Sequence, residues 1–300
     1  MKKFSLKKTG SLFITTSKKW FDRDPFREGA IIAYNAIFAL PGLLVVVISL
    51  AGYFFGAEAV SGQLHRQIAQ AMGVSTADSI QQMVIMSMRI RTSLLTTIIG
   101  IGTIIFGATA VFVELQKTLN IIWEVNATSA KSGIWAILKT RLFSFGLILS
   151  IAFLLLISLV LSSLLSALGI WIQQYWSESL LLFFKLFNAV LSIGIITILF
   201  GLMFKIIPDA KIKWNSVWLG AFITSLLFVI GKTALGIYFG TANPGSLYGA
   251  AGSIILILLW TSYSSMILFF GAEFTKVYSD MYFGDIPADE NAVKDKGRVK

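Results

Sequence analysis

A single lysine inside an apolar stretch is the residue whose chemistry most needs an explanation. Lys232 lies in the string FVIGKTALGIYFG, and Gly236 and Gly240 follow at intervals of four residues, so all three share one helix face. A lysine at the centre of a membrane helix costs roughly 2.5–3.5 kcal/mol, and glycines let a helix or a ligand come close. The pattern predicts a cationic site for an anionic group such as a phosphate or carboxylate. The alternative is that Lys232 snorkels to the outer interface or pairs with an outer carboxylate, such as Glu58 or Glu178.

A second group of polar residues lies near the ends of three apolar stretches. Asn35 falls one turn into the first stretch, Glu114 ends the second and Glu273 ends the last. If successive stretches cross a bilayer in opposite directions, all three residues lie at a similar depth and line one polar vestibule. The alternative is local ion pairing, because Glu114 with Lys117 and Glu273 with Lys276 have the spacing of helix ion pairs.

The chain lacks the residues that several common kinds of catalytic site require. There is no cysteine, and His65 is the only histidine, so a thiolate site, a histidine metal site and a histidine dyad are excluded within one chain. The sequence also has no phosphate-binding glycine loop followed by Lys-Ser/Thr and no dense carboxylate cluster for two-metal chemistry. We therefore expect no enzymatic activity, no metal and no cofactor.

The elements that position these residues are long apolar stretches. Of 300 residues, 56% are hydrophobic and 13% are charged, against about 25% charged in a typical soluble domain. A bilayer core of about 30 Å needs roughly 20 apolar residues in a helix. Six stretches meet this need, and they cover approximately residues 30–55, 94–113, 142–172, 186–204, 218–239 and 248–271. The sequence predicts an all-α polytopic bundle of six transmembrane helices.

The distribution of basic residues predicts the orientation of these helices. If both termini are cytoplasmic, 20 of the 25 Lys and Arg residues fall in inner segments, and only Arg66, Arg89, Arg91 and Lys185 fall in outer ones. This asymmetry is the positive-inside pattern, and it also supports an even number of spans. The net charge of +10 then indicates anionic lipid at the inner face as a partner, and not nucleic acid.

Three regions outside the spans have a character of their own. Residues 60–91 show helical spacing of apolar residues and predict two short amphipathic helices in the outer segment 56–93. Residues 17–28 predict an amphipathic cytoplasmic helix with Trp20 at the interface, within a basic N-terminal segment 1–29. The membrane domain then covers 30–272, and the cytoplasmic tail 273–300 is expected to be disordered from Asp285 onward.

Two further residues bear on helix shape. Pro41 lies in the middle of the first span, where its ring frees the carbonyl of Ile37 and predicts a bend that borders a cavity or serves only as architecture. Gly249 begins the last span, where a missing side chain permits tight helix packing.

Four strings of the sequence resemble those of the YihY/virulence factor BrkB family. They are AYNAIFALPG from Ala33, VELQKTLNIIWEV from Val113, FKIIPDAKIKWNSVWLGA from Phe204 and SLYGAAGSIILILLWTSYSSMILFFGAEF from Ser246. The resemblance covers residues from about 15 to 280 and implies a six-span protein of the bacterial inner membrane. The polar and packing positions that it carries over are Tyr34, Asn35, Glu114, Asn120, Pro208, Lys232, Tyr248, Gly249 and Glu273. Gly42 departs from the family pattern, which puts the bend of the first span in doubt.

The sequence and the resemblance together support two classes of function. The leading hypothesis is a permease or flippase-like transporter of a small or lipid-derived solute, with Lys232, Asn35, Glu114 and Glu273 lining its pathway together with Tyr34, Asn120 and Tyr248. The alternative is an envelope scaffold that binds partners or anionic lipid and transports nothing. Some relatives carry a ribonuclease label, which the missing metal ligands and histidine pair make a poor fit. An oligomer is compatible with either function.

Overall fold

The computed structural model describes residues 6–89, 110–127, 178–242, 244–289 and 292–294 of the chain, nearly all of them helical. Three described helices are long and apolar enough to cross a bilayer, over Ala189–Ile206, Trp214–Ala242 and Gly252–Tyr282. The predicted helical class is confirmed in this part of the chain, but the count of six spans is not. Of the predicted spans, 142–172 lies outside the described residues, and so does 94–113 except for helical residues 110–113.

The N-terminal region forms two helices that meet at a sharp break. Helix α1 covers Leu6–Asp22 and α2 covers Pro25–Phe55, and Asp24 between them has a left-handed backbone with φ of 54°. Its carboxylate accepts a hydrogen bond from the amide of Arg27, and Pro25 occupies the first turn, where its missing N–H costs nothing. The prediction of one continuous helix over 17–28 is therefore wrong, because Asp24 and Pro25 start a new helix.

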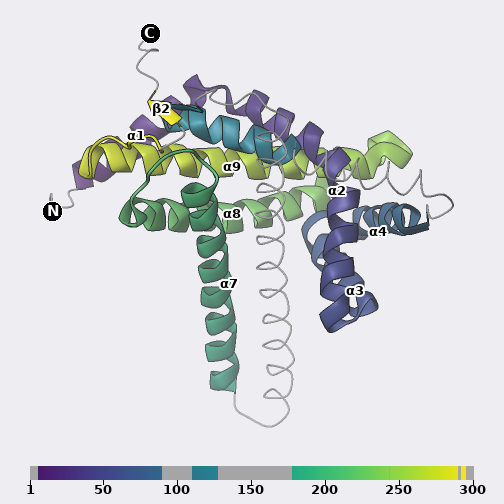
Figure 1. Cartoon of the computed structure of the whole chain (residues 1–300). Coiled ribbons are helices and arrows are strands. Elements are labelled where there is room, and N and C mark those ends of the chain that lie inside the picture. Colours follow the sequence, from purple (N-terminus) through teal and green to yellow (C-terminus); the bar gives the residue numbers. More distant parts are fainter. Residues whose placement is uncertain (1–5, 90–109, 128–177, 243, 290–291, 295–300) are drawn as a thin grey trace.

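Helix α2 continues through Pro41 to Phe55, and Figure 1 shows that it changes direction along its length. It is followed by α3, Ala57–Met72, and α4, Val74–Arg89. Gly56 and Gly73 separate the three helices with φ of 85° and 90°, values that favour glycine. The prediction of two short amphipathic helices after the first span is confirmed.

The second half of the chain is built on three long helices. Helix α7 covers Glu178–Ile206, α8 covers Trp214–Ala242 and α9 covers Gly252–Tyr282, and the 3₁₀ helix η1, Pro244–Ala251, precedes α9. In Figure 1, α8 and α9 lie side by side while α7 projects away from them. Helix α9 continues beyond the predicted end at residue 271, so Glu273 lies within the helix and not at its end.

Helices α8 and α9 are antiparallel and in very close contact. A Cβ atom added to Gly220 of α8 would overlap the side chain of Thr275 on α9, and one added to Gly271 of α9 would overlap Thr224 on α8. Both threonine hydroxyls donate to a carbonyl in their own helix, that of Gly220 or Gly271, so neither hydroxyl is left unsatisfied. Small residues with satisfied hydroxyls are the usual means of bringing membrane helices together.

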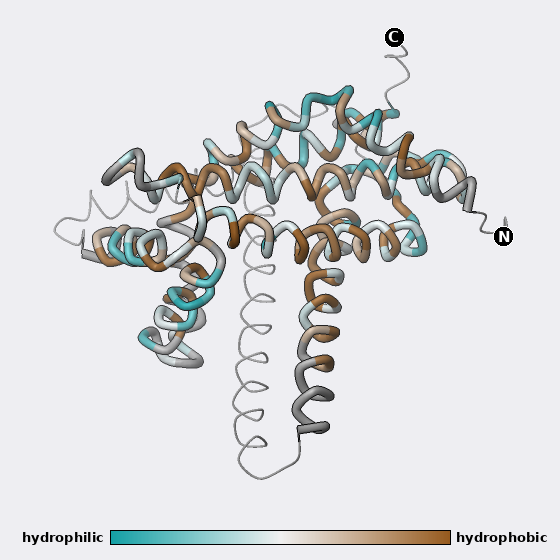
Figure 2. The backbone as a smooth tube through the Cα atoms, turned by 180° about the vertical axis from the view of Figure 1, so that it is seen from behind, coloured by the Kyte–Doolittle hydropathy of each residue, from teal (hydrophilic) through white to brown (hydrophobic). Residues whose placement is uncertain are grey.

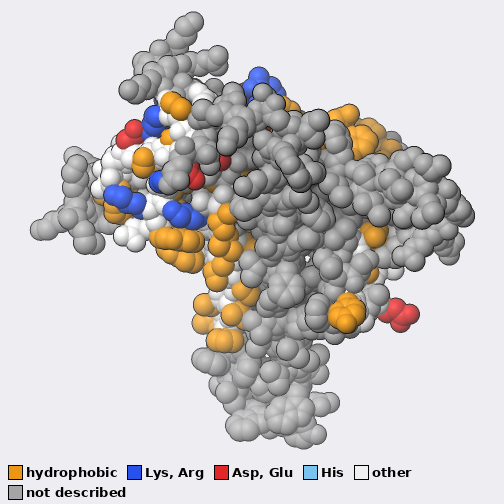
Figure 3. All heavy atoms as spheres, in the orientation of Figure 1, with side chains coloured by type: hydrophobic (Ala, Val, Ile, Leu, Met, Phe, Trp, Pro, Cys, Tyr) orange, Lys and Arg blue, Asp and Glu red, His pale blue; other side chains and the backbone are white. Residues whose placement is uncertain are grey.

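The largest hydrophobic core lies where helical residues 110–122 meet α7, α8 and α9. Trp123, Leu119, Phe204, Val217 and Ala272 at its centre have no exposed surface. Figure 2 shows long hydrophobic stretches along α7 and α8, whereas α3 and α4 alternate between hydrophobic and hydrophilic residues. In the space-filling view of Figure 3, hydrophobic side chains cover the visible face of α7, and basic side chains gather near the α7–α8 connection. This division fits helices that contact lipid beside a polar end that does not.

The C-terminal segment is docked against this polar end. Strand β2, Ala292–Lys294, pairs antiparallel with β1, Val125–Ala127, and Ala210 forms a bridge with Ala288. Ile286 is buried beneath them. The prediction of disorder from Asp285 is wrong for the described residues of this segment, and the all-α prediction omits this small sheet. In this segment the buried Ile286 and the backbone pairing outweigh the polar composition on which the prediction of disorder relied.

A pH-dependent contact holds the tail in place. Asp285 accepts hydrogen bonds from Lys294 and Lys276, and the bond from Lys294 is the main reason that the pKa of Asp285 lies below its ordinary value of 3.8. A depressed folded pKa gives stability that is present above the unfolded pKa of about 3.9 and is lost as pH falls through the folded value. The effect is small because the Asp285 side chain is 66% exposed.

We therefore expect the tail to loosen in acid. The measurement is the anisotropy of a fluorophore on Val293→Cys, which should fall as pH drops below about 4. In Asp285→Asn the anisotropy should be slightly lower at neutral pH than in the unmodified chain and should change little in acid. An acid-induced fall of equal size in that variant would show that another group controls docking.

Candidate functional site

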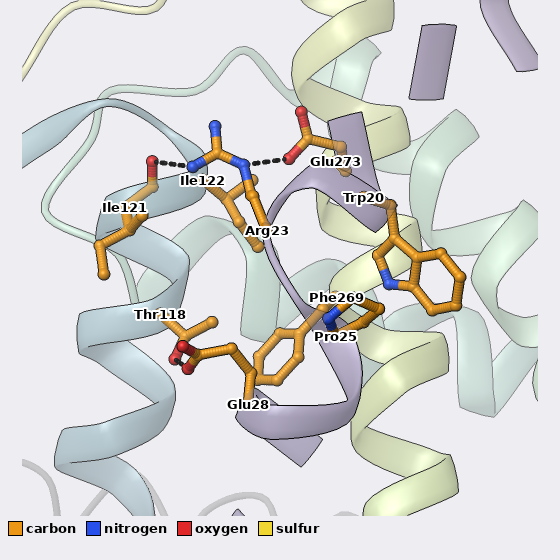
Figure 4. Close-up of a pocket in the computed structure, with 9 residues that line it drawn as sticks. All are labelled: Trp20, Arg23, Pro25, Glu28, Thr118, Ile121, Ile122, Phe269 and Glu273. Atoms are coloured by element: carbon orange, nitrogen blue, oxygen red, sulfur yellow. Dashed lines mark hydrogen bonds and ion pairs between the residues drawn. The ribbon is translucent and has the colours of Figure 1, made fainter. Parts of the chain in front are cut away.

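Three segments that are far apart in the sequence line a small cavity that is mostly apolar and contains a few charged side chains (Figure 4). They are the junction of α1 and α2, the helical residues 110–122, and the middle of α9. The cavity has a volume of about 30 Å³. Its lining consists of Trp20, Arg23, Pro25, Glu28, Thr118, Ile121, Ile122, Phe269 and Glu273.

Glu273 on α9 is the most unusual residue of this cavity. Its side chain is only 1% exposed, and its Oε2 atom accepts a hydrogen bond of 2.9 Å from Nε of Arg23. Its other oxygen, Oε1, is buried and has no hydrogen-bond partner among the described residues. A buried charge without full compensation is costly, which makes Glu273 a strong candidate for a functional group.

Arg23 reaches the cavity because the helix breaks directly after it. Its Nη1 atom donates to the carbonyl of Ile121 at 3.1 Å, so one guanidinium joins the α1–α2 junction to both other segments. The side chain is 30% exposed, and it therefore connects buried Glu273 to solvent.

A second carboxylate lies at the lower side of the cavity in Figure 4. Glu28 Oε2 accepts from the Thr118 hydroxyl at 2.9 Å, and its Oε1 accepts from Arg27 at 3.1 Å. Trp20 donates from Nε1 to the carbonyl of Met266 at 3.2 Å, which fixes the indole against α9. Unlike Glu273, Glu28 has a partner for each oxygen.

The size of the cavity limits what it can hold in this conformation. A water needs at least about 10–15 Å³ of such volume, so a cavity of about 30 Å³ has room for roughly two waters and not for an organic solute. Among the described residues, no three His, Cys, Asp or Glu side chains are grouped to hold a metal. The chemistry that this arrangement supports is proton binding or transfer on a carboxylate with a partly exposed counter-ion.

The structure does not gather the polar layer expected from the sequence. Of its three members, only Glu273 lines the cavity. Glu114 pairs with Lys117 at 3.2 Å, as the local alternative predicted, and Asn35 donates to the carbonyl of Ile31 in its own helix. The other local alternative, a pair between Glu273 and Lys276, is not formed.

Lys276 instead belongs to a separate network. It is buried to 2% exposure, and its Nζ atom lies 2.8 Å from Asp280, 3.4 Å from Glu124 and 3.4 Å from Asp285. These three carboxylates come from α9, from the segment before β1 and from the tail. This network stabilises the docked tail. Because Lys276 is engaged in it, Glu273 pairs with Arg23.

The remaining predicted residues lie apart from the cavity. Lys232 is exposed on α8, and a Cβ atom added to Gly236 or Gly240 meets no described atom within 4 Å. Tyr34, beside Phe38, and Tyr248 are also exposed, at 63% and 56%. Pro41 lies within α2 and Gly249 within η1. A cationic groove at Lys232 stays a prediction.

Asn120 is buried and forms a clamp that the sequence did not predict. Its Nδ2 atom donates to the carboxylate of Asp209 at 2.7 Å, and its Oδ1 atom accepts from the Asp209 amide at 2.8 Å. Gln116 also donates to this carboxylate. The clamp fixes the α7–α8 connection, which contains Pro208, onto helical residues 110–122, so the role of Asn120 is structural.

We expect Asn120→Ala to release the α7–α8 connection. The Asp209 amide and carboxylate each lose a partner, which costs about 1–3 kcal/mol when such groups stay buried. Hydrogen exchange measures this directly, and the Asp209 amide should exchange faster in the variant. Gln116→Ala is the control, because it removes a carboxylate contact and leaves the amide bonded. Equal exchange in Asn120→Ala and the unmodified chain would contradict the assignment.

Sequence reasoning missed Arg23, Glu28, Thr118 and Trp20 as members of the site. One local signal was available: Asp24 followed by Pro25 is a helix start, and a helix break places the flanking Arg23 and Glu28 side chains at a junction. Nothing local indicated which other segments meet that junction.

Comparisons with known proteins agree on the family. A family profile described as Virulence factor BrkB matches residues 16–296. A UPF0761 membrane protein of Saccharophagus degradans is 25% identical over 90% of this chain, and one of Tolumonas auensis is 27% identical over 85%. A third, from Haemophilus influenzae, is 25% identical over 92% of this chain and 97% of its own length. The match covers 81% of the Tolumonas protein but 60% of the Saccharophagus protein. No solved structure matches the chain.

Proposed function

The chain belongs to the Virulence factor BrkB family of membrane proteins, and on that premise we propose that it is a permease for a small or lipid-derived solute. The observation that carries the proposal is the buried Glu273 carboxylate, which has one oxygen without a partner among the described residues and lines a cavity shared by three segments. Such a group is a poor source of stability alone, because an apolar residue of similar size often packs at lower cost. Ionisable groups inside membrane helices usually belong to substrate or ion pathways.

In this proposal, the cavity is a solute site near the cytoplasmic side of the membrane, seen in its closed conformation. Its volume excludes a solute, so passage requires the α1–α2 junction to separate from α9 and from helical residues 110–122. Arg23 resists this separation at both boundaries, because it bonds Glu273 and the carbonyl of Ile121. The Trp20 bond to Met266 and the Thr118 bond to Glu28 add one contact at each boundary. Rocking of one group of helices against another is the usual motion of transporters.

Proteoliposomes test the proposal. Bleaching of fluorescent phosphatidylglycerol by external dithionite measures lipid translocation, and solid-supported membrane currents measure movement of a panel of amino acids, organic anions and organic cations. A permease should give a signal above protein-free liposomes in one of these assays. Silence in all of them, together with a stoichiometric protein partner whose loss reproduces the deletion phenotype, would establish the scaffold alternative.

We also place both termini on the cytoplasmic side of the bacterial inner membrane, with six spans. The excess of basic residues on the proposed inner side supports this orientation. The chain lacks cysteine, so a membrane-impermeant thiol reagent gives no background. Ser61→Cys should react from outside intact cells, and Lys131→Cys should react only after permeabilisation. The reverse pattern would overturn the orientation.

Anionic lipid at the inner face is the partner that we assign to α1. Ile14 and Phe21 are 73% and 60% exposed, and Lys18 lies between them on the same face, whereas Leu12 is buried against α9. An apolar stripe with a lysine suits the headgroup region. We expect a spin label on Phe21→Cys to lie deeper in nanodiscs that contain phosphatidylglycerol than in purely zwitterionic ones. Lys18→Glu should remove this difference.

A further inference from the structure

We propose that Glu273 binds the coupling proton of this permease and that its protonation releases Arg23 from α9. The inference rests on the proposed function and names the ion that drives it. Three observations about the cavity carry it: the unpaired Oε1 atom, the single counter-ion, and the room for water.

The unpaired oxygen provides the acceptor. Glu273 Oε1 is buried and has no partner in the part of the chain that the structure describes, while Oε2 accepts from Arg23 at 2.9 Å. A proton on Oε1 leaves the Arg23 contact sterically undisturbed. Burial disfavours the charged carboxylate and the Arg23 guanidinium favours it, so the two effects oppose each other on this one group.

The charges that face Glu273 come from each neighbouring segment. Arg23 and Lys19, from α1 and the residue after it, favour the carboxylate, and Glu124, at the end of helical residues 110–122, disfavours it. Glu28 lines the same cavity from α2. On α9 itself, Lys276 is paired with other carboxylates. Arg23 is thus the only cation within hydrogen-bond distance of Glu273 among the described residues.

The binding step moves one proton and no other atom. Oε1 has almost no solvent-accessible surface in this conformation, so water donates a proton to it only when fluctuation of the partly exposed Arg23 admits that water. The carboxylate then becomes a neutral acid, and the ion pair with Arg23 becomes a hydrogen bond to a neutral oxygen. Arg23 keeps its charge and is then drawn toward Glu28 or Glu124. The Arg23 contact between the α1–α2 junction and α9 is weakened, the Trp20 bond to Met266 remains, and the cavity widens more easily. Deprotonation reverses the sequence.

A proton fits this site better than a metal ion. Arg23 already places a positive charge at Glu273, and its repulsion acts against a second cation. The described residues offer no group of three metal ligands there. About two waters in the cavity suffice to carry a proton.

Infrared difference spectroscopy on the full chain in nanodiscs tests proton binding directly. A change of pH should produce the carbonyl stretch of a newly protonated carboxylic acid, with the frequency of a buried group. Glu273→Gln should abolish this band, Glu273→Asp should shift it, and Glu28→Gln should retain it. A band that persists unchanged in both Glu273 variants would overturn the inference, and so would its absence in the unmodified chain at every pH where the protein stays folded.

Proton movement in proteoliposomes, followed with an entrapped pH dye, separates this inference from the proposed function. If solute moves without protons, at equal rates in the unmodified chain and in Glu273→Gln, the protein is a permease but Glu273 does not couple it to protons. If the Glu273 carboxyl band appears but no solute, lipid or proton moves, Glu273 binds a proton and the proposed permease function is wrong. The inference predicts that both movements fall at least tenfold in Glu273→Gln.

Discussion

Replacing Arg23 with alanine is expected to destabilise the folded protein by about 3 kcal/mol. Removing one member of a buried ion pair costs about 3–5 kcal/mol because the other charge stays buried and uncompensated, and the 30% exposure of Arg23 puts this pair at the low end. Glu273 is the charge that is stranded, with neither carboxylate oxygen bonded. Unfolding of the detergent-solubilised protein by added SDS measures the effect.

The double variant tells whether the cost comes from the stranded charge. Adding Glu273→Gln to Arg23→Ala leaves a neutral amide in the cavity, so we expect most of the lost stability to return. Lys117→Ala is the matched control, because its pair with Glu114 lies on the surface and is worth about 0–1 kcal/mol. If the double variant is as unstable as Arg23→Ala, the loss comes from packing or from the Ile121 contact, and the stranded-charge explanation is wrong.

The second large effect is expected at the contact between α8 and α9. Gly220→Ala adds a Cβ atom that overlaps the Thr275 side chain, so the helices must move apart. Overpacking of this kind costs about 1–3 kcal/mol. In an exposed helix, the same change stabilises by about 0.5–1 kcal/mol, because alanine has the higher helix propensity.

Gly236→Ala is the control on the same helix, since a Cβ atom there meets no described atom within 4 Å. Thermal unfolding in detergent should therefore show opposite signs, a lower midpoint for Gly220→Ala and an unchanged or higher one for Gly236→Ala. Gly220→Ala combined with Thr275→Ser should recover part of the loss, because serine lacks the methyl group of threonine. A loss of equal size at Gly236 would show that another helix covers that face.

The sequence predicted those features that depend on local pattern. The apolar lengths of α8 and α9 and the amphipathic spacing of α3 and α4 follow from residues that are neighbours along one helix. The same reasoning anticipated the pair of Glu114 with Lys117, which are separated by one turn. Each of these features needs no knowledge of how the helices meet.

The candidate site depends on contacts between distant segments, and for that reason it was only partly predictable. Arg23 and Glu273 are 250 residues apart, and Thr118 and Glu28 are 90 apart. Glu273 was identified from its position at the end of an apolar stretch, but no pattern indicated its partner. The prediction of one layer with Asn35 and Glu114 assumed straight helices of equal depth. The break at Asp24 and the extension of α9 to Tyr282 change that geometry.

The most direct test of the whole account compares two glutamates in the same flux assay. Glu273 lines the buried cavity, and Glu114 is paired with Lys117 on the surface of a neighbouring helix. With the solute or lipid that the proteoliposome survey identifies, Glu273→Gln should reduce flux at least tenfold and Glu114→Gln should leave it within twofold of the unmodified chain. Equal flux in all three proteins, at equal amounts of folded protein, would contradict a functional role for the Glu273 cavity.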